Sequence, residues 1–419
     1  MERKERIAVV GSGIAGLTSA YLLSRRYDVT LYEANDYAGG HTHTRPVTLD
    51  GTTWPVNTGF IVFNDWTYPN FIRLMRELHV PYEASDMSFS VQSEGNGLEY
   101  NGTSLNALFA QRRNLFNPRF LGMVRDILRF NRVTRRDLDQ DAIGANETLG
   151  EYLDRYRFGR YFRQHYIIPM GAAIWSAPEV ITERFPARFF LRFFNNHGML
   201  SVDDRPTWRV ISGGSAQYVT PILKALGDAV QLNTPVTGIE RHTNKVTVHS
   251  ARGSEDFDQV VMATHSDQAL RLLQSPTEEE KAILGALPYQ NNEVILHTDT
   301  RLLPRKRLAW AAWNYHLPEA PDQPVSVTYN MNILQNFKAP ETFCVTLNRT
   351  DRIDPGRIID RFEYAHPLFT LEGMQAQEQH GMISGHNRTH YCGAYWFNGF
   401  HEDGVNSALR VTRALGIDW

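Results

Sequence analysis

Three glycines near the amino terminus have the spacing of a turn that receives a phosphate. The chain runs from an apolar segment, RIAVV (6–10), into Gly11-Ser12-Gly13-Ile14-Ala15-Gly16 and then into the helical pattern LTSAYLLSRR. Gly11 permits a tight turn, Gly13 lets a pyrophosphate approach the backbone, and Gly16 lets the helix pack closely on the strand. The free N–H groups at the helix start also favour an anion. This segment therefore predicts a dinucleotide site that includes Ile14 and Ala15.

A carboxylate stands where such a turn needs one. A second strand-like run, DVTLYE, ends at Glu33, which follows Gly11 by 22 residues (33 − 11). A spacing of about 20 is expected for an acid that binds the ribose hydroxyls, and a carboxylate there disfavours the 2′-phosphate of NADP. Ala34 follows directly, and Gly39-Gly40 allow a second close approach of the chain to a long cofactor. Such a second glycine pair is typical of FAD proteins rather than NAD proteins.

Further along, four segments resemble landmarks of the flavin-containing amine oxidase superfamily, which also includes phytoene desaturases and protoporphyrinogen oxidases. These segments are WRVISGGSAQYVTPILKAL (208–226), VQLNTPVTGIERHTNKVTVHS (230–250), DQVVMATHSDQALRLL (258–273) and YCGAYWFNGFHEDGVNSALRVTRALG (391–416). The resemblance implies an α/β fold, in which a Rossmann-type FAD-binding domain carries a discontinuous α+β substrate domain. We expect the FAD domain at 1–85, 205–285 and 385–419, and the substrate domain at 86–204 and 286–384.

The same resemblance implies which residues contact FAD. The superfamily usually has an arginine after the glycine pair, where this chain has His41, and Val236 falls where the family places a backbone contact to adenine. A strand that ends at Gly393 and a helix that begins near Gly404 would aim a positive helix end at the flavin. FAD is expected to be non-covalent, because Cys392 lies before the flavin loop. The expected contacts are Gly11, Gly13, Ile14, Ala15, Gly16, Glu33, Ala34, Gly39, Gly40, His41, Thr58, Gly59, Phe60, Val236, Ala263, Gly393, His401, Glu402, Asp403, Gly404 and Val405.

Candidates for catalysis come from the substrate side. True amine oxidases of the superfamily place a lysine near the flavin, and the matching strand, NNEVILH, has Glu293 there, or Asn292 if the register differs by one. The missing lysine argues against a small-amine oxidase. Trp175, Tyr395 and Phe400 are aromatic candidates for the substrate face, although each also suits a core position. His41 and His43 fall short of the ligands that a zinc site needs, so no metal is expected.

A narrower resemblance suggests the substrate. The segments VNTGFIVFNDWTYPNF (56–71), PMGAAIWS (169–176), TYNMNILQ (328–335) and GAYWFNGFHEDG (393–404) are similar to bacterial flavin proteins often encoded beside cyclopropane fatty acid synthases. This implies an FAD-dependent oxidoreductase that transfers a hydride from an apolar or lipid-like substrate, such as an unsaturated or cyclopropane acyl chain, to flavin N5. It also implies a functional partnership with such a synthase. Two alternatives stay open: a small-amine oxidase, and a flavoprotein whose FAD is structural or supports isomerisation without net oxidation.

Composition limits the partners. The chain has 419 residues, a net charge of −3 and two cysteines, which predicts no nucleic-acid partner and suits a reducing, cytoplasmic compartment. No apolar run reaches the length of about 18 residues that a membrane-spanning helix needs.

Charge is nevertheless concentrated in one segment. Residues 112–136 contain eight arginines and one acid, Asp126. A helix there would place Phe120, Met123, Ile127 and Phe130 opposite the arginines, which predicts peripheral binding to the inner face of a membrane through that apolar side. The alternative is that this side packs on the substrate domain while the arginines are solvated.

Overall fold

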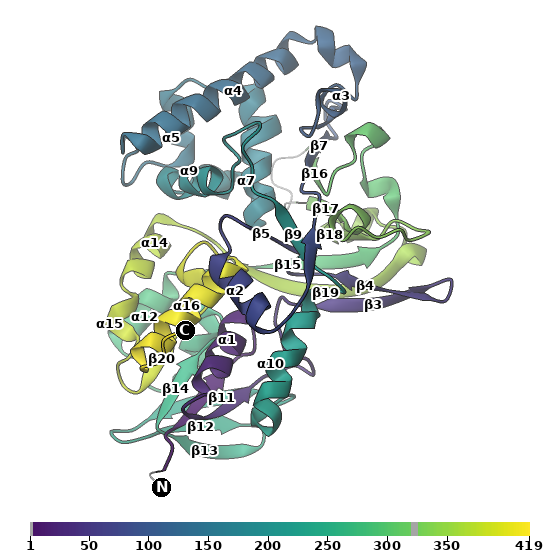
Figure 1. Ribbon diagram of the computed structural model, residues 1–419. Helices are drawn as coiled ribbons and strands as arrows, with labels where there is room; N and C mark the ends of the chain where they lie inside the picture. Colours follow the sequence, from purple (N-terminus) through teal and green to yellow (C-terminus); the bar gives the residue numbers. More distant parts are fainter. Residues whose placement is uncertain (1–2, 320–325) are drawn as a thin grey trace.

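Strands that lie far apart in the sequence form one parallel sheet of five strands (Figure 1). The computed structural model describes residues 3–319 and 326–419. The strand order is β10-β2-β1-β14-β20, and each neighbouring pair is parallel. The five strands are β1 (Arg6–Val10), β2 (Asp28–Tyr32), β10 (Val230–Gln231), β14 (Gln259–Met262) and β20 (Thr389–Tyr391).

Alternation along β1 explains how this sheet is covered on both faces. Ile7 and Val9 pack into a core with α1 (Ile14–Leu23), α10 (Val219–Leu226) and α16 (His401–Ala414). Ala8 and Val10 point the other way, into a second core. Successive side chains of a strand leave opposite faces, so a strand buried on both sides is apolar throughout. The second core is formed with β11 (Val236–Arg241), β12 (Val246–Ser250), β13 (Gly253–Phe257), α11 (Ser266–Leu272) and α12 (Glu278–Gly285).

The other half of the molecule contains a second sheet of seven strands. Their order is β19-β15-β18-β17-β16-β7-β8. Its pairs are antiparallel except β16 with β7. All seven strands come from 86–204 and 286–384, whereas the parallel sheet draws its strands from the remaining stretches. The strands are β7 (Phe89–Ser93), β8 (Glu99–Asn101), β15 (Tyr289–His297), β16 (Trp313–Leu317), β17 (Ser326–Asn330), β18 (Cys344–Leu347) and β19 (Ile358–Pro367).

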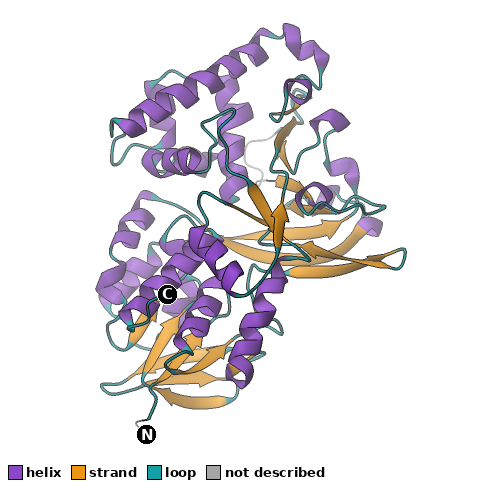
Figure 2. Cartoon of the chain, viewed as in Figure 1, coloured by secondary structure: helices purple, strands orange, loops and turns teal. Residues whose placement is uncertain are grey.

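Helices cover this second sheet on the side away from the parallel sheet, as Figure 2 shows. They share a large aromatic core. These helices are α3 (Leu105–Leu108), α4 (Pro118–Asp139), α5 (Leu149–Arg155), α6 (Arg160–Phe162), α7 (Ile168–Trp175), α8 (Glu179–Glu183) and α9 (Ala187–Asn196).

The remaining helices and strands are short. They are β3 (Thr44–Leu49), β4 (Thr52–Asn57), β5 (Val62–Asn64), α2 (Pro69–Glu77), β6 (Tyr82–Ala84), β9 (Trp208–Ile211), α13 (Met331–Leu334), α14 (Leu371–Glu378) and α15 (His380–Ile383). Together with the two sheets they form the predicted α/β architecture.

Two predicted helices differ from those observed. The segment 112–136 is not one helix: a 3-10 turn, η1 (Arg112–Phe116), precedes α4, and the side chain of Asn117 caps α4 by accepting the backbone N–H of Arg119 at 3.0 Å. The expected membrane-facing side is also wrong, because Phe120, Met123 and Phe130 are buried in the aromatic core of the chain itself. At the carboxyl end, α16 begins at His401 rather than near Gly404.

None of the helices within 3–319 and 326–419 combines the length and the hydropathy that crossing a bilayer requires.

Candidate cofactor and substrate site

A single cavity of about 1070 Å³ begins at the carboxyl ends of β1, β2 and β14 and continues into the other half of the molecule. Ligands of open parallel sheets bind at this edge. One half of the cavity, here called the glycine half, is lined by the Gly11–Ala15 turn, Glu33 and the Gly39-Gly40 pair. The other, the aromatic half, is lined by side chains such as Trp175 and Phe193.

The three glycines of the turn differ in what surrounds them. A Cβ on Gly16 would lie 1.9 Å from the carbonyl oxygen of Gly11, and one on Gly11 would lie 2.9 Å from that of Ala263. Gly11 also has a φ of +99°, which favours glycine. A Cβ on Gly13 would meet no atom within 4 Å. Gly11 and Gly16 are thus required by the protein, while Gly13 faces the open space in which a pyrophosphate fits.

Glu33 is held in place by the turn that it faces. Its carboxylate accepts the backbone N–H of Ser12 at 3.0 Å and the Ser12 hydroxyl at 2.5 Å. It also accepts the backbone N–H of Asn35 at 2.9 Å. These bonds fix the carboxylate at the cavity wall, where its remaining lone pairs suit ribose hydroxyls. Sequence reasoning missed Ser12, although its place between two glycines of the motif was the available signal.

His41 lines the cavity and carries a buried polar atom without a partner in the described part of the chain. Its Nε2 is buried and has no hydrogen-bond partner among the described residues. Its ring centroid lies 5.3 Å from that of His366 and 6.4 Å from that of His265. Burial, followed by these neighbouring rings, lowers the pKa of His41 well below its usual value. His41 is therefore a neutral side chain at the wall of the glycine half.

His401 begins the helix α16 at the same wall. Its ring stacks on Phe60 with centroids 3.5 Å apart, and its Nε2 lies 2.9 Å from the hydroxyl of Thr42. Burial lowers the pKa of His401 to about 3, so the ring is neutral. The start of α16 is therefore fixed against the segment that follows the glycine pair, with His401 and Phe400 facing the cavity.

Most of the predicted cofactor contacts line this cavity. They are Gly11, Gly13, Ile14, Ala15, Glu33, Ala34, Gly39, Gly40, His41, Gly59, Phe60, Val236, Ala263, Gly393 and His401. They come from segments of the chain that the parallel sheet and its connections bring together.

The other predicted contacts do not line the cavity, and their assignment is corrected. Glu402 accepts the backbone N–H groups of Asn70 and Phe71, which begin α2, at 3.1 and 2.8 Å. Asp403 caps its own helix at the N–H of Phe400, 2.9 Å away. These residues lie within the first turn of α16 because that helix begins earlier than predicted. Four more residues are corrected. Gly404 packs on Ile14, and the hydroxyl of Thr58 is bonded to that of Tyr364. Gly16 is buried in α1 and Val405 is buried in α16.

Three of the four predicted catalytic residues line the cavity. Trp175, at the end of α7, donates its indole N–H to the carbonyl of Asn398 at 3.3 Å. Phe400 stacks on Phe193 with centroids 5.0 Å apart. Tyr395 lines the cavity, and its hydroxyl is buried without a partner among the described residues. Residues that sequence reasoning missed here are Phe193, Met199, Trp313, Tyr329 and Phe369.

The fourth, Glu293, is corrected. Alternation along β15 buries Asn292 and turns Glu293 to the surface, where it pairs with Arg361 at 3.5 Å and accepts the Thr350 hydroxyl at 2.5 Å. Neither Glu293 nor Asn292 lines the cavity. Asn292 instead holds a residue of the cavity wall, because its Nδ2 lies 3.1 Å from Nδ1 of His366. No lysine occurs among the described residues that line the cavity.

Sequence comparisons agree with this arrangement. Residues 14–341 match the family described as flavin containing amine oxidoreductase. The chain is 28% identical over 268 residues to a putative flavin-containing monoamine oxidase, AofH, of Mycobacterium tuberculosis, covering 61% of this chain and 56% of that protein. It is 26% identical over 308 residues to the L-amino-acid oxidase of Mus musculus, covering 68% and 46%. The chain thus spans about half the length of these curated relatives.

Solved structures share the fold over nearly the whole chain. A fatty acid isomerase of P. acnes, described as producing CLA, superposes with a TM-score of 0.70 at 17% identity, covering 99% of both chains. Cyclohexylamine oxidase from Brevibacterium oxydans gives a TM-score of 0.68 at 15% identity, with the same coverage. At these identities the likeness concerns the fold, and it confirms the predicted fold class.

Proposed function

Since this chain belongs to the flavin-containing amine oxidoreductase family, we propose that it is an FAD-dependent oxidoreductase for an apolar or lipid-like substrate. Unsaturated and cyclopropane fatty acyl chains are the candidates. FAD is the cofactor of the family, and the residues of the glycine half fit it: Gly13 leaves room and Glu33 offers a fixed carboxylate. When bound, FAD supplies the acceptor for a hydride.

The composition of the aromatic half carries the substrate proposal. Between 86 and 204 its lining contains no acid, lysine or arginine: Met87, Ile174, Trp175, Ser176, Phe193, His197 and Met199. His197 is neutral, because burial lowers its pKa to about 4. A substrate ammonium placed here would lose water without gaining a carboxylate partner, whereas each buried methylene of an acyl chain contributes about 0.8 kcal/mol.

Residues of this half also hold the substrate in one orientation and exclude water. Trp175 is fixed by its bond to Asn398 and by four phenylalanine rings around it. Phe400 is fixed by stacking on Phe193. Aromatic walls that cannot move give a C–H bond a defined position, which is the protein's share of flavin catalysis.

A small-amine oxidase is the second candidate, favoured by the names of the curated relatives. The acid in the cavity lining between 286 and 384 is Glu363, whose carboxylate is exposed and accepts the side-chain N–H of Asn291 at 2.7 Å. A third candidate is a flavoprotein that isomerises its substrate without net oxidation. Partnership with a cyclopropane fatty acid synthase-like enzyme stays a prediction.

Anaerobic photometry of the FAD-loaded protein distinguishes these candidates. We expect an unsaturated or cyclopropane fatty acid to bleach the flavin, and benzylamine, a polyamine and an L-amino acid to leave it oxidised. Rapid bleaching by an amine alone would overturn the proposal. An oxidised flavin together with a displaced double bond in the recovered lipid would establish the isomerase. Trp175→Phe should slow the reduction by lipid, while the matched Trp396→Phe, which lies outside the cavity lining, should not.

A further inference from the structure

The outward side of α4 carries leucines and arginines on one line. Leu121, Arg125, Leu128, Arg132 and Arg135 are spaced by four, three, four and three residues, so they share a helix face. All five are exposed; the leucines are 42% and 51% exposed, and the Arg125 side chain is 80% exposed. This face is opposite to the buried side formed by Phe120, Met123 and Phe130.

The elements before α4 extend this surface. Phe116 in η1 is 87% exposed and Leu115 is 45% exposed, while Leu105 in α3 is 77% exposed. Figure 1 shows α3 and α4 at the outer edge of the substrate domain, at the opposite end of the molecule from the parallel sheet. We call the set the outer face. It comprises Leu105, Leu115, Phe116, Leu121, Leu128, Arg112, Arg125, Arg132 and Arg135.

The arginines of the outer face are poorly neutralised. Within the described residues, Arg112, Arg132 and Arg135 form no ion pair, and Arg125 reaches Asp126 only at 3.9 Å. Asp126 is itself buried. At the end of the line lies a surface hollow of about 390 Å³, lined by Arg132, Arg135, Arg136, Asp139 and Gln140. Arg136 is paired with Asp137, so the guanidinium groups of Arg132 and Arg135 are the two that could bind a phosphate monoester or diester here.

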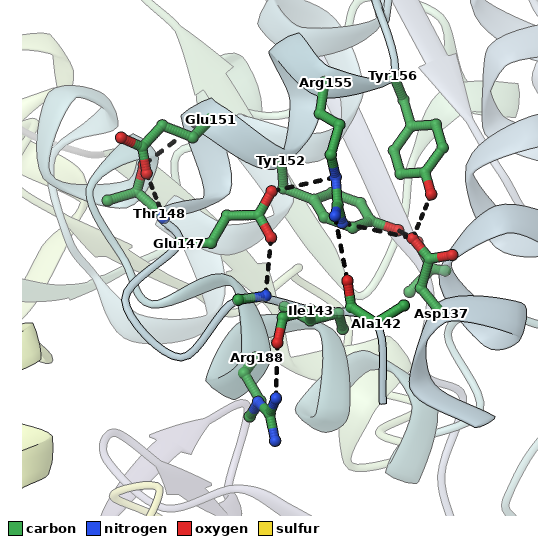
Figure 3. A network of polar contacts seen from close by, with 12 residues as sticks. Asp137, Ala142, Ile143, Glu147, Thr148, Glu151, Tyr152, Arg155, Tyr156 and Arg188 are labelled. Atoms are coloured by element: carbon green, nitrogen blue, oxygen red, sulfur yellow. Dashed lines mark hydrogen bonds and ion pairs between the residues drawn. The ribbon is translucent and has the colours of Figure 1, made fainter. Parts of the chain in front are cut away.

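A buried network fixes α4 so that this side stays outward (Figure 3). The carboxylate of Asp137 accepts the hydroxyls of Tyr156 and Tyr152 at 2.5 and 3.2 Å, and it pairs with Arg136 at 2.8 Å and Arg155 at 3.5 Å. These bonds tie the end of α4 to α5. The inner side of α4 shares its core with Trp175 and Phe193 of the cavity, so the outer face and the substrate half belong to one packed unit.

We propose that the outer face docks the protein on an anionic lipid bilayer. Exposed Phe and Leu side chains among arginines match an interface in which apolar groups enter the acyl boundary and guanidinium groups bind headgroup phosphates. An overall charge of −3 directs the remainder of the molecule away from such a surface. This docking does not depend on which substrate the cavity takes, and vesicle binding and flavin reduction test the two proposals separately.

Co-sedimentation of the FAD-loaded protein with vesicles tests the docking. Vesicles of phosphatidylcholine with phosphatidylglycerol should bind the protein, and pure phosphatidylcholine should bind it much less. Raising the salt from about 0.1 M, where charges act over about 10 Å, to about 1 M, where they act over about 3 Å, should release most of it. Arg125→Glu with Arg132→Glu should lower the partition at least about fivefold per residue. The matched control, Arg3→Glu with Lys281→Glu in the other domain, should not.

Apolar insertion has its own control. Phe116→Glu should weaken binding about tenfold or more, whereas Met382→Glu, at an apolar residue of α15 that is 56% exposed, should have no effect. FAD content must be equal in all variants. No binding to anionic vesicles at low salt would overturn the proposal. So would a result in which Phe116→Glu changes only the oligomeric state of the protein, because the outer face would then contact a second copy of the chain.

Discussion

The two halves of the cavity are built in different ways. The glycine half consists of backbone, a helix start and one carboxylate, and its essential parts lie between Gly11 and Gly40. The aromatic half consists of side chains from α7, α9, β16, β17, β19 and the loop before α16. A site made of backbone tolerates few changes anywhere along a short segment. A site made of side chains can take a new substrate through single substitutions while the fold persists.

The largest effect should come from the glycines of the turn, where two similar substitutions have different consequences. Gly16→Ala places a Cβ 1.9 Å from a backbone oxygen, so helix and strand must separate, and we expect a loss of about 3 kcal/mol or more in the free energy of unfolding. Gly13→Ala meets no protein atom and should leave the stability of the FAD-free protein unchanged within about 0.5 kcal/mol.

Gly13→Ala should instead affect cofactor binding, and we expect the affinity for FAD to fall at least about tenfold. Thermal unfolding without FAD and flavin fluorescence titration measure the two quantities. Equal destabilisation of the FAD-free protein by both substitutions would contradict the assignment of Gly13 to the pyrophosphate.

Acid should lower the stability of the folded protein, because buried histidines lie in both halves of the molecule. Burial lowers the pKa of several histidines from about 6.5: to about 3 for His401, and to about 4 for His197, His297, His316, His366, His380 and His390. Below pH 6.5 the unfolded chain binds protons that the folded chain excludes, so stability is complete above that pH and falls toward pH 4. Each such group contributes a slope of up to about 1.4 kcal/mol per pH unit.

Three carboxyls act in the opposite sense, because burial raises the pKa of Asp403 to about 7 and also raises the pKa of Glu402 and Glu179, but the seven histidines outnumber them. Chemical unfolding measured between pH 7 and 4.5 should therefore show falling stability and release of FAD. His366→Gln removes one of these groups, so the dependence of stability on pH should fall by up to about 1.4 kcal/mol per pH unit. A stability that is constant over this range would show that these rings are protonated in the folded protein.

An intermediate effect is expected at the carboxylate of the glycine half. Glu33→Gln places an amide where two N–H groups and a hydroxyl of the protein point, which disturbs the orientation of the side chain. Its loss of charge should also weaken the hydrogen bonds to the ribose hydroxyls by about 2 kcal/mol. FAD affinity should fall about 30-fold. The neighbouring exposed Asp36→Asn serves as the control and should bind FAD normally. If both variants retain FAD, the ribose role of Glu33 is wrong.

The smallest effect is expected at Glu293. Its ion pair with Arg361 is exposed, so Glu293→Gln should change stability by less than about 1 kcal/mol and leave flavin reduction unchanged. Asn292→Ala on the buried side of the same strand removes bonds to His366 and Asn348 and should alter reduction. Steady-state rates of the pair test this, and a slower reaction in Glu293→Gln alone would return that residue to the site.

The spacing of neighbouring residues locates the glycine half of the cavity. Gly11, Gly13, Glu33 and Gly39-Gly40 line it, because a turn and a strand end are set by local backbone geometry. Asp403 and Gly404 were misassigned because the start of α16 depends on the cap at Phe400, and a shift of three residues turns a contact into core. Phe193 and Trp313 come together only through tertiary packing, and no spacing signals that. The inner side of α4 was mistaken for a membrane face because amphipathicity does not say which side the rest of the chain covers.

The central claim is that cofactor and apolar substrate occupy the two halves of one cavity. Titration of the oxidised, FAD-loaded protein tests it without turnover, by following the flavin spectrum as a saturated long-chain fatty acid or benzylamine is added. We expect the fatty acid to perturb the spectrum and the amine to have no effect. Met199→Asp adds a carboxylate to the wall of the aromatic half. It should lower the affinity for the fatty acid at least about tenfold and allow benzylamine to bind. A wild-type spectrum that responds to the amine and ignores the fatty acid would contradict the claim.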